Sequence, residues 1–180
     1  MPDSYAKSTP FHAGAPEDRA RSLGGQLAEV HQWLRAELAR LREEIAAYAG
    51  SDTAQSPTPL RVHCTAFCQA LTRHHTSEDT TGFPALGEQF PELIPVLEEL
   101  RRDHRLVADI LRRLRELLTT LTPDNAEPVR RELDGLTAIL ESHFQWEERR
   151  LLDAFDALQT PRTSEDLFGP AIRREDEHRR

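Results

Sequence analysis

The sequence is poor in residues that build β-structure and in the apolar runs that cross membranes. Only eight of its 180 residues are glycine, and β-branched and aromatic runs are scarce, so an all-β fold has little support. No apolar run reaches the length that spans a bilayer, and the first residues lack the basic-then-apolar pattern of a signal peptide. We therefore expect a cytoplasmic protein that does not enter a membrane.

Cysteine and lysine are also rare. Cys64 and Cys68 lie four residues apart in a helical pattern, where rigid helix geometry disfavours a disulfide, so we expect reduced thiols. Lys7 is the only lysine among 23 basic residues, and the net charge is −8. This charge argues against a general nucleic-acid binder and indicates only good solubility.

What the sequence does contain is long amphipathic segments. The stretches YAGSDTAQSPTP, TGFPALGEQFP and TPDNAEP carry the residues that stop helices. Between these breaks, apolar residues recur three and four positions apart, as on a helix with one buried face. The four predicted helices lie near residues 19–49, 60–81, 92–121 and 126–158.

Three regions follow from this pattern. Residues 1–16 are rich in proline, glycine and small polar residues and are predicted to be a flexible N-terminal arm. Residues 17–159 form the predicted domain, an all-α, up-down-up-down antiparallel four-helix bundle. Residues 160–180 are predicted to be a polar C-terminal tail that packs weakly around Leu167, Phe168 and Ile172.

Each apolar stripe is interrupted by a histidine, and two of the histidines are followed one turn later by a glutamate. The interrupting residues are His31, His74, Glu78, His104, His143 and Glu147. The adjacent His75 is rotated by about 100° from the stripe. We therefore predict that His75 lies behind these six residues or at the surface; its i+3 spacing to Glu78 leaves a direct role beside them as the alternative.

The four histidines of the stripes are predicted to meet at one height of the bundle. In an antiparallel hairpin, residues equidistant from the turn lie side by side. The midpoints between successive histidines fall near residues 52, 89 and 123–124, and each lies inside one of the three breaks. The bundle should therefore hold all four in a single layer.

A buried layer of this composition favours a metal site. Six unsatisfied buried polar groups would cost ~6–18 kcal/mol, against a total domain stability of ~5–15 kcal/mol. Glu–His pairing offsets part of this cost, and a bound cation offsets it more completely. Imidazole and carboxylate donors together suit iron, manganese or zinc, and two carboxylates suit a pair of metals.

Three stretches carry a resemblance to a known family. These are HHTSED with the following Phe83-Pro84, RRDHRLV around His104, and ESHFQWEERRLL around His143. Over about residues 20–158 the chain resembles the hemerythrin-like, or HHE cation-binding, family. The resemblance implies two iron ions with an oxo or hydroxo bridge, although manganese or zinc could replace them. It also implies that Glu78 and Glu147 bridge the metals, while the four histidines of the layer are terminal ligands.

Two positions differ from the oxygen-carrying members of this family. Those members have a second histidine one turn along the third helix, where this chain has Ala108. They also have an aspartate five residues after the histidine of the fourth helix, where this chain has Glu148, with Glu147 better placed. One imidazole fewer would leave more coordination positions open.

Open coordination positions on the metals favour an oxidoreductase that activates dioxygen, or reduces peroxide or nitric oxide. Its electrons would come from an external donor. The alternative is a protein that binds oxygen reversibly or senses iron or oxygen without turnover. A third possibility is a structural bundle with a vestigial or zinc-filled site, but ligand-type residues in all four segments count against it.

Several polar residues have open roles. Asp79 and Glu148 could orient imidazole N–H groups or simply face solvent. His63 lies three turns from His74, about 16 Å along a straight helix, and is predicted to be a core or entrance residue. For Tyr48, packing is favoured over a redox or ligand role.

The two tryptophans and the histidines near the chain ends lie outside the predicted layer. Trp33 and Trp146 lie off the stripes and are expected to pack between helices or at a dimer face, so the protein could be a monomer or a homodimer. No role is assigned to His12 or His178.

Overall fold

The computed structural model describes residues 22–51 and 55–170. The predicted arm at 1–16, and with it His12, lies outside the described residues, as do Ile172 and His178. None of the described helices is both long enough and apolar enough to cross a membrane.

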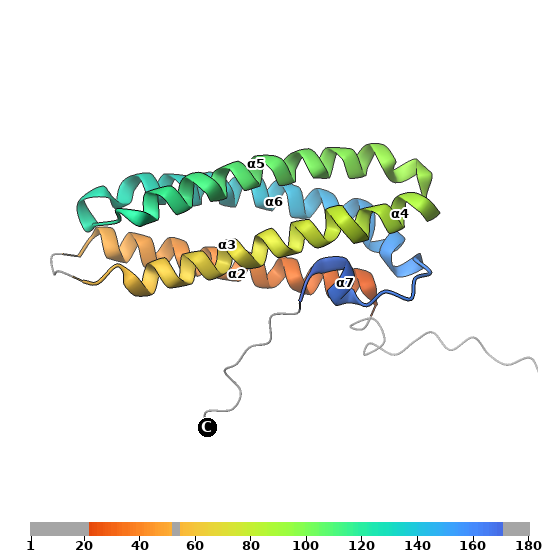
Figure 1. The fold of residues 1–180 in the computed structure, drawn as a ribbon, viewed down its shortest axis with the longest axis horizontal. Helices are drawn as coiled ribbons and strands as arrows, with labels where there is room; N and C mark the ends of the chain where they lie inside the picture. The colour runs from red at the N-terminus through yellow and green to blue at the C-terminus, as the bar shows by residue number, and fades with distance from the viewer. Residues whose placement is uncertain (1–21, 52–54, 171–180) are drawn as a thin grey trace, which may run out of the picture.

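Four long helices form the body of the protein (Figure 1). They are α2 (Leu23–Ala49), α3 (Thr58–Ser77), α5 (Ile94–Thr119) and α6 (Ala126–Ala157). Helix α2 packs against α3 and α6, and α5 packs against the same two helices, so each helix occupies one corner of the bundle. This arrangement confirms the predicted all-α four-helix bundle.

The helix ends have local causes in the sequence. The Ser22 side chain accepts a hydrogen bond from the N–H of Gly25 at the start of α2. Helices α3 and α5 each have a proline in the first turn, where its missing N–H costs no helical hydrogen bond. Before α6, the Thr122 N–H donates to Asn125 Oδ1 at 2.7 Å across the short 3₁₀ turn Pro123–Asn125.

The second predicted break is wrong in one respect, because the chain stays helical through most of it. Helix α3 runs into a π-helical turn (Glu78–Gly82), then α4 (Phe83–Gln89) and a 3₁₀ turn (Pro91–Leu93). Pro84 does not break this path because it lies in the first turn of α4. The Phe83 N–H donates to the carbonyl of Glu78, five residues back, and the Asp79 carbonyl accepts from Arg101 at 3.3 Å.

Two apolar clusters fill the bundle, and the polar layer lies between them. On α2, Leu27 belongs to one cluster and Leu34 to the other, with His31 between them. The same order recurs on α5, where Leu100 and Val107 flank the layer. The apolar residues on either side therefore hold each helix in a fixed rotation, which directs the layer's side chains inward.

The segment after α6 packs more tightly than the sequence predicts. Helix α7 (Ser164–Phe168) places Leu167 and Phe168 in the core at 0% and 2% exposure. The Phe168 ring lies edge-on to Phe155 with centroids 4.8 Å apart. Gly169 ends the helix at φ 86°, a conformation that favours glycine.

Candidate metal centre

The structure brings all six predicted ligand residues into one layer. None of them is more than 4% exposed: His31, His74, Glu78, His104, His143 and Glu147. The histidines form two pairs. His31 Nε2 lies 3.2 Å from His74 Nε2 between α2 and α3, and His104 Nε2 lies 3.2 Å from His143 Nε2 between α5 and α6.

Each glutamate reaches a histidine of both pairs. Glu78 Oε1 lies 3.3 Å from His74 Nε2, and its Oε2 lies 3.5 Å from His104 Nε2. Glu147 Oε2 lies 3.4 Å from His31 Nε2 and 3.5 Å from His143 Nε2. Imidazole nitrogens and carboxylate oxygens this close together would suit a bound metal cation. Metal ligation itself stays a prediction.

Every one of the four histidines has a hydrogen-bond acceptor on its outer nitrogen. His31 Nδ1 lies 2.9 Å from Glu148 Oε1, and His74 Nδ1 lies 2.9 Å from the Phe168 carbonyl oxygen. His104 Nδ1 lies 2.9 Å from Asp79 Oδ1, and His143 Nδ1 lies 3.3 Å from Asp103 Oδ2. Because these partners accept hydrogen bonds, each Nδ1 carries the proton. The four Nε2 atoms then point inward with free lone pairs, as metal-binding imidazoles do.

These contacts decide between the two roles left open for Asp79 and Glu148, since both hold an imidazole N–H. Arg35 supports Glu148 from behind, with Nη1 2.8 Å from its carboxylate. Burial raises the pKa of Glu148, but hydrogen bonds from His31 and Arg35 outweigh burial and lower it to about 2. Glu148 therefore stays ionised and keeps its imidazole partner in the orientation described above.

Sequence reasoning missed two of the outer partners. Asp103 directly precedes His104 but binds His143 on the neighbouring helix, a contact that only the packed bundle reveals. The hydrogen bond from His143 lowers the pKa of Asp103. The carbonyl of Phe168 carries no signal in the sequence, because every residue has a carbonyl.

The interior of the layer lacks hydrogen-bond donors. In the described part of the chain, six buried side-chain polar atoms have no hydrogen-bond partner, and five of them belong to Glu78, Glu147 and His75. Burial, together with the negative charge of Glu147, raises the pKa of Glu78 well above its ordinary range. Burial and the neighbouring His31 lower the pKa of His74. Lone pairs and carboxylates that converge without donors fit a bound cation.

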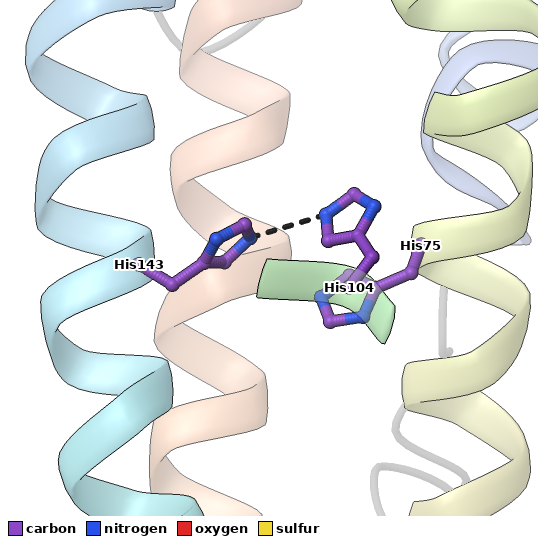
Figure 2. Close-up of side chains that lie close together, drawn as sticks. All are labelled: His75, His104 and His143. Carbon is purple, nitrogen blue, oxygen red and sulfur yellow. Dashed lines mark hydrogen bonds between the residues drawn. The ribbon is translucent and has the colours of Figure 1, made fainter. Parts of the chain in front are cut away.

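His75 is not at the surface, contrary to one of the two predicted locations. It is only 6% exposed, and its ring stacks on that of His104 with centroids 3.9 Å apart and planes 11° from parallel. Figure 2 shows His75, His104 and His143 converging from three helices. Burial, and next the neighbouring His104, lower the pKa of His75 well below its ordinary value. The surface alternative is wrong because α3 faces two neighbouring helices, so two successive positions turn inward.

The remaining polar residues named from the sequence lie elsewhere. His63 is paired with Glu37 and Glu44 at 2.9 and 2.7 Å, away from the layer. Tyr48 packs in the apolar cluster with Leu34. Ala108 lies on the exposed side of α5.

The two cysteines and two tryptophans take structural positions. Cys64 and Cys68 are free and buried, as expected for reduced thiols. A hydrogen bond with Cys68, together with burial, raises the pKa of Cys64. Trp33 and Trp146 each pack against one of the two apolar clusters.

Comparison with known proteins agrees with this geometry. The sequence model described as the Hemerythrin HHE cation binding domain matches residues 25–155, and it matches again over 97–180. No curated protein and no solved structure matches the chain. The first match covers all four long helices except their outer ends, together with the whole histidine and glutamate layer. The chain belongs to the hemerythrin HHE cation-binding family.

Proposed function

We propose that the protein holds two iron ions in this layer and acts as an oxidoreductase on dioxygen, peroxide or nitric oxide. The observation that carries the proposal is the donor-free interior, in which four Nε2 atoms face two carboxylates. Iron bound there would supply electrons to a small oxidant. Manganese or zinc would fit the same donors.

The residues around the layer favour small reactants over organic substrates. The ring of Phe144 stacks on His31 with centroids 4.1 Å apart, and Phe83 stacks on His104 at 5.5 Å. With aromatic rings against two of its histidines, the layer favours a small oxidant over an organic substrate, and electrons would come from a donor outside the bundle.

The protein's own groups would keep the site preorganised. Each imidazole is held by an acceptor on its outer nitrogen, so its lone pair faces the layer before any cation arrives. Glu78 and Glu147 lie where each can contact both histidine pairs. The apolar clusters on both sides exclude water and limit side reactions.

A second candidate is reversible binding or sensing of oxygen without turnover. The buried His75 favours it, because an additional imidazole beside His104 and His143 would close a position that turnover could use. This offsets the argument from Ala108, which rested on a missing histidine.

Anaerobic loading with ferrous iron tests the proposal. We expect about two irons per chain after excess metal is removed, and a sharp loss in His74→Ala and Glu147→Ala. His63→Ala, in α3 but away from the layer, is the matched control and should retain its iron. A metal-free wild-type protein would contradict the proposal.

The loaded protein then separates the two candidate functions. After mixing with dioxygen, an oxidoreductase should form a ferric product that argon does not reverse, and should consume oxidant continuously when a reductant is supplied. A reversible binder should return to the ferrous spectrum under argon and show no sustained consumption.

A further inference from the structure

His75 is a fifth buried histidine that lies against the layer. Its Nε2 is fully enclosed and makes no hydrogen bond. One ligand-type nitrogen from each of His75, His104 and His143 lies within 4.8 Å of the others. Three imidazoles at this spacing can bind one cation together.

The position of α3 in the bundle explains why two adjacent histidines both face inward. Helix α3 contacts α2 on one side and α5 on the other. His74 lies beside His31 of α2, whereas His75, about 100° further round the helix, lies beside His104 of α5. The two histidines therefore serve opposite halves of the same layer.

Simple packing does not account for His75 well. An apolar residue could fill the space against the His104 ring without burying a polar nitrogen, which costs ~1–3 kcal/mol when it has no partner. The ring also lies edge-on to His143, with centroids 5.3 Å apart, so its surroundings are polar on two sides. Once the His75 ring rotates out of its parallel stack on His104, a lone pair directed at a shared cation would satisfy the enclosed nitrogen.

We propose that His75 is a fifth imidazole ligand, binding the same cation as His104 and His143. The two halves of the centre then differ, with His31 and His74 on one side and three histidines on the other. The half with two histidines keeps more positions open for an incoming small molecule. The inference rests on the proposed function only in requiring that cations fill the layer.

Two variants of the full chain separate ligation from packing. His75→Ala removes both the ring and its nitrogen, whereas His75→Phe keeps an aromatic ring against His104 and removes only the nitrogen. Loss of a group that merely supports a ligand lowers metal affinity ~10–100-fold. If His75 is a ligand, both variants should weaken one of the two metals by more than about 100-fold. His63→Ala is again the control.

The probe is cobalt(II), loaded anaerobically, because its visible absorption reports coordination number without redox chemistry. We expect about two cobalt ions in the wild type and about one retained in each His75 variant, with a changed spectrum. Added imidazole should restore the second ion in His75→Ala, where space is available, and not in His75→Phe. The inference is overturned if His75→Phe retains both ions with the wild-type spectrum.

A result that refutes the oxidoreductase proposal can be told apart from one that refutes the role of His75. A wild type that binds two cobalt ions but whose ferrous form does not react with dioxygen, peroxide or nitric oxide would refute the oxidoreductase proposal. In that case the cobalt spectra of the variants would still decide the role of His75. A wild type that takes up no metal would overturn both proposals.

Discussion

Glu78→Gln should make the metal-free protein more stable and the metal-bound protein less stable. Glu78 is 0% exposed, and neither carboxylate oxygen has a hydrogen-bond partner in the described residues. Its nearest imidazole nitrogens, at 3.3 Å on His74 and 3.5 Å on His104, present lone pairs. Without metal and with Glu78 ionised, acceptors therefore face acceptors. Glutamine has almost the same shape and offers two N–H donors to those lone pairs.

The expected magnitude follows from the cost of an unsatisfied buried group. Relief of ~1–3 kcal/mol should raise the melting temperature of a domain this size by roughly 2–12 °C, at ~2–4 °C per kcal/mol. With metal bound, the wild type should be more stable than Glu78→Gln. Metal at 100 times its dissociation constant stabilises the wild type by about 2.7 kcal/mol, and glutamine, a poor bridging ligand, forfeits most of that gain.

The stability difference should also depend on pH. The pKa of Glu78 is raised above its ordinary value of 4.5, so the folded metal-free protein binds this proton more tightly than the unfolded chain. Wild-type stability from this group is therefore fully present below pH 4.5 and is lost as pH rises towards the folded pKa. The advantage of Glu78→Gln should be smallest near pH 4 and larger at pH 7.

The assay is urea unfolding followed by circular dichroism at 222 nm, with chelator or with excess zinc, which avoids redox chemistry. Glu88→Gln on the exposed face of α4 is the matched control and should change stability by less than about 0.5 kcal/mol. If Glu78→Gln is less stable than wild type in chelator, the layer already satisfies its carboxylate, and the argument for a cation from unpaired acceptors fails.

Two further predictions concern the groups behind the layer, and a third concerns Gly135 on the exposed side of α6. Glu148→Gln should lower metal affinity ~10–100-fold in chelator competition. Glu141→Gln alters contacts with the same arginine and with Gln145 but touches no histidine of the layer, so it should leave metal affinity nearly unchanged. Gly169→Ala should destabilise by about 1–3 kcal/mol, because alanine rarely adopts this backbone conformation, and should weaken metal retention by displacing the Phe168 carbonyl. Gly135→Ala, where the added Cβ meets nothing within 4 Å, should instead stabilise α6 by roughly 0.5–1 kcal/mol, measured in the same urea titration.

The sequence by itself determined the helices and the layer. Apolar residues three and four apart define one buried face for each long helix, and polar residues on that face have to meet in the core. The turns lie midway between successive histidines, so His31, His74, His104 and His143 come to one height whatever the details of packing. The end of the second helix was less predictable, because a π-turn keeps the backbone helical through Pro84.

Only the tertiary structure decided which further groups join that layer. His75 faces inward because α3 lies at a corner of the bundle and contacts two helices. The apolar pattern of one helix predicts a single buried face and does not reveal this second contact. Asp103 and Arg35 act on residues of other helices, at sequence separations of 40 and 113. Phe168 contributes a backbone carbonyl to His74 from 94 residues away. Periodicity reports which face of a helix is buried, whereas partners across the bundle depend on how the helices pack together.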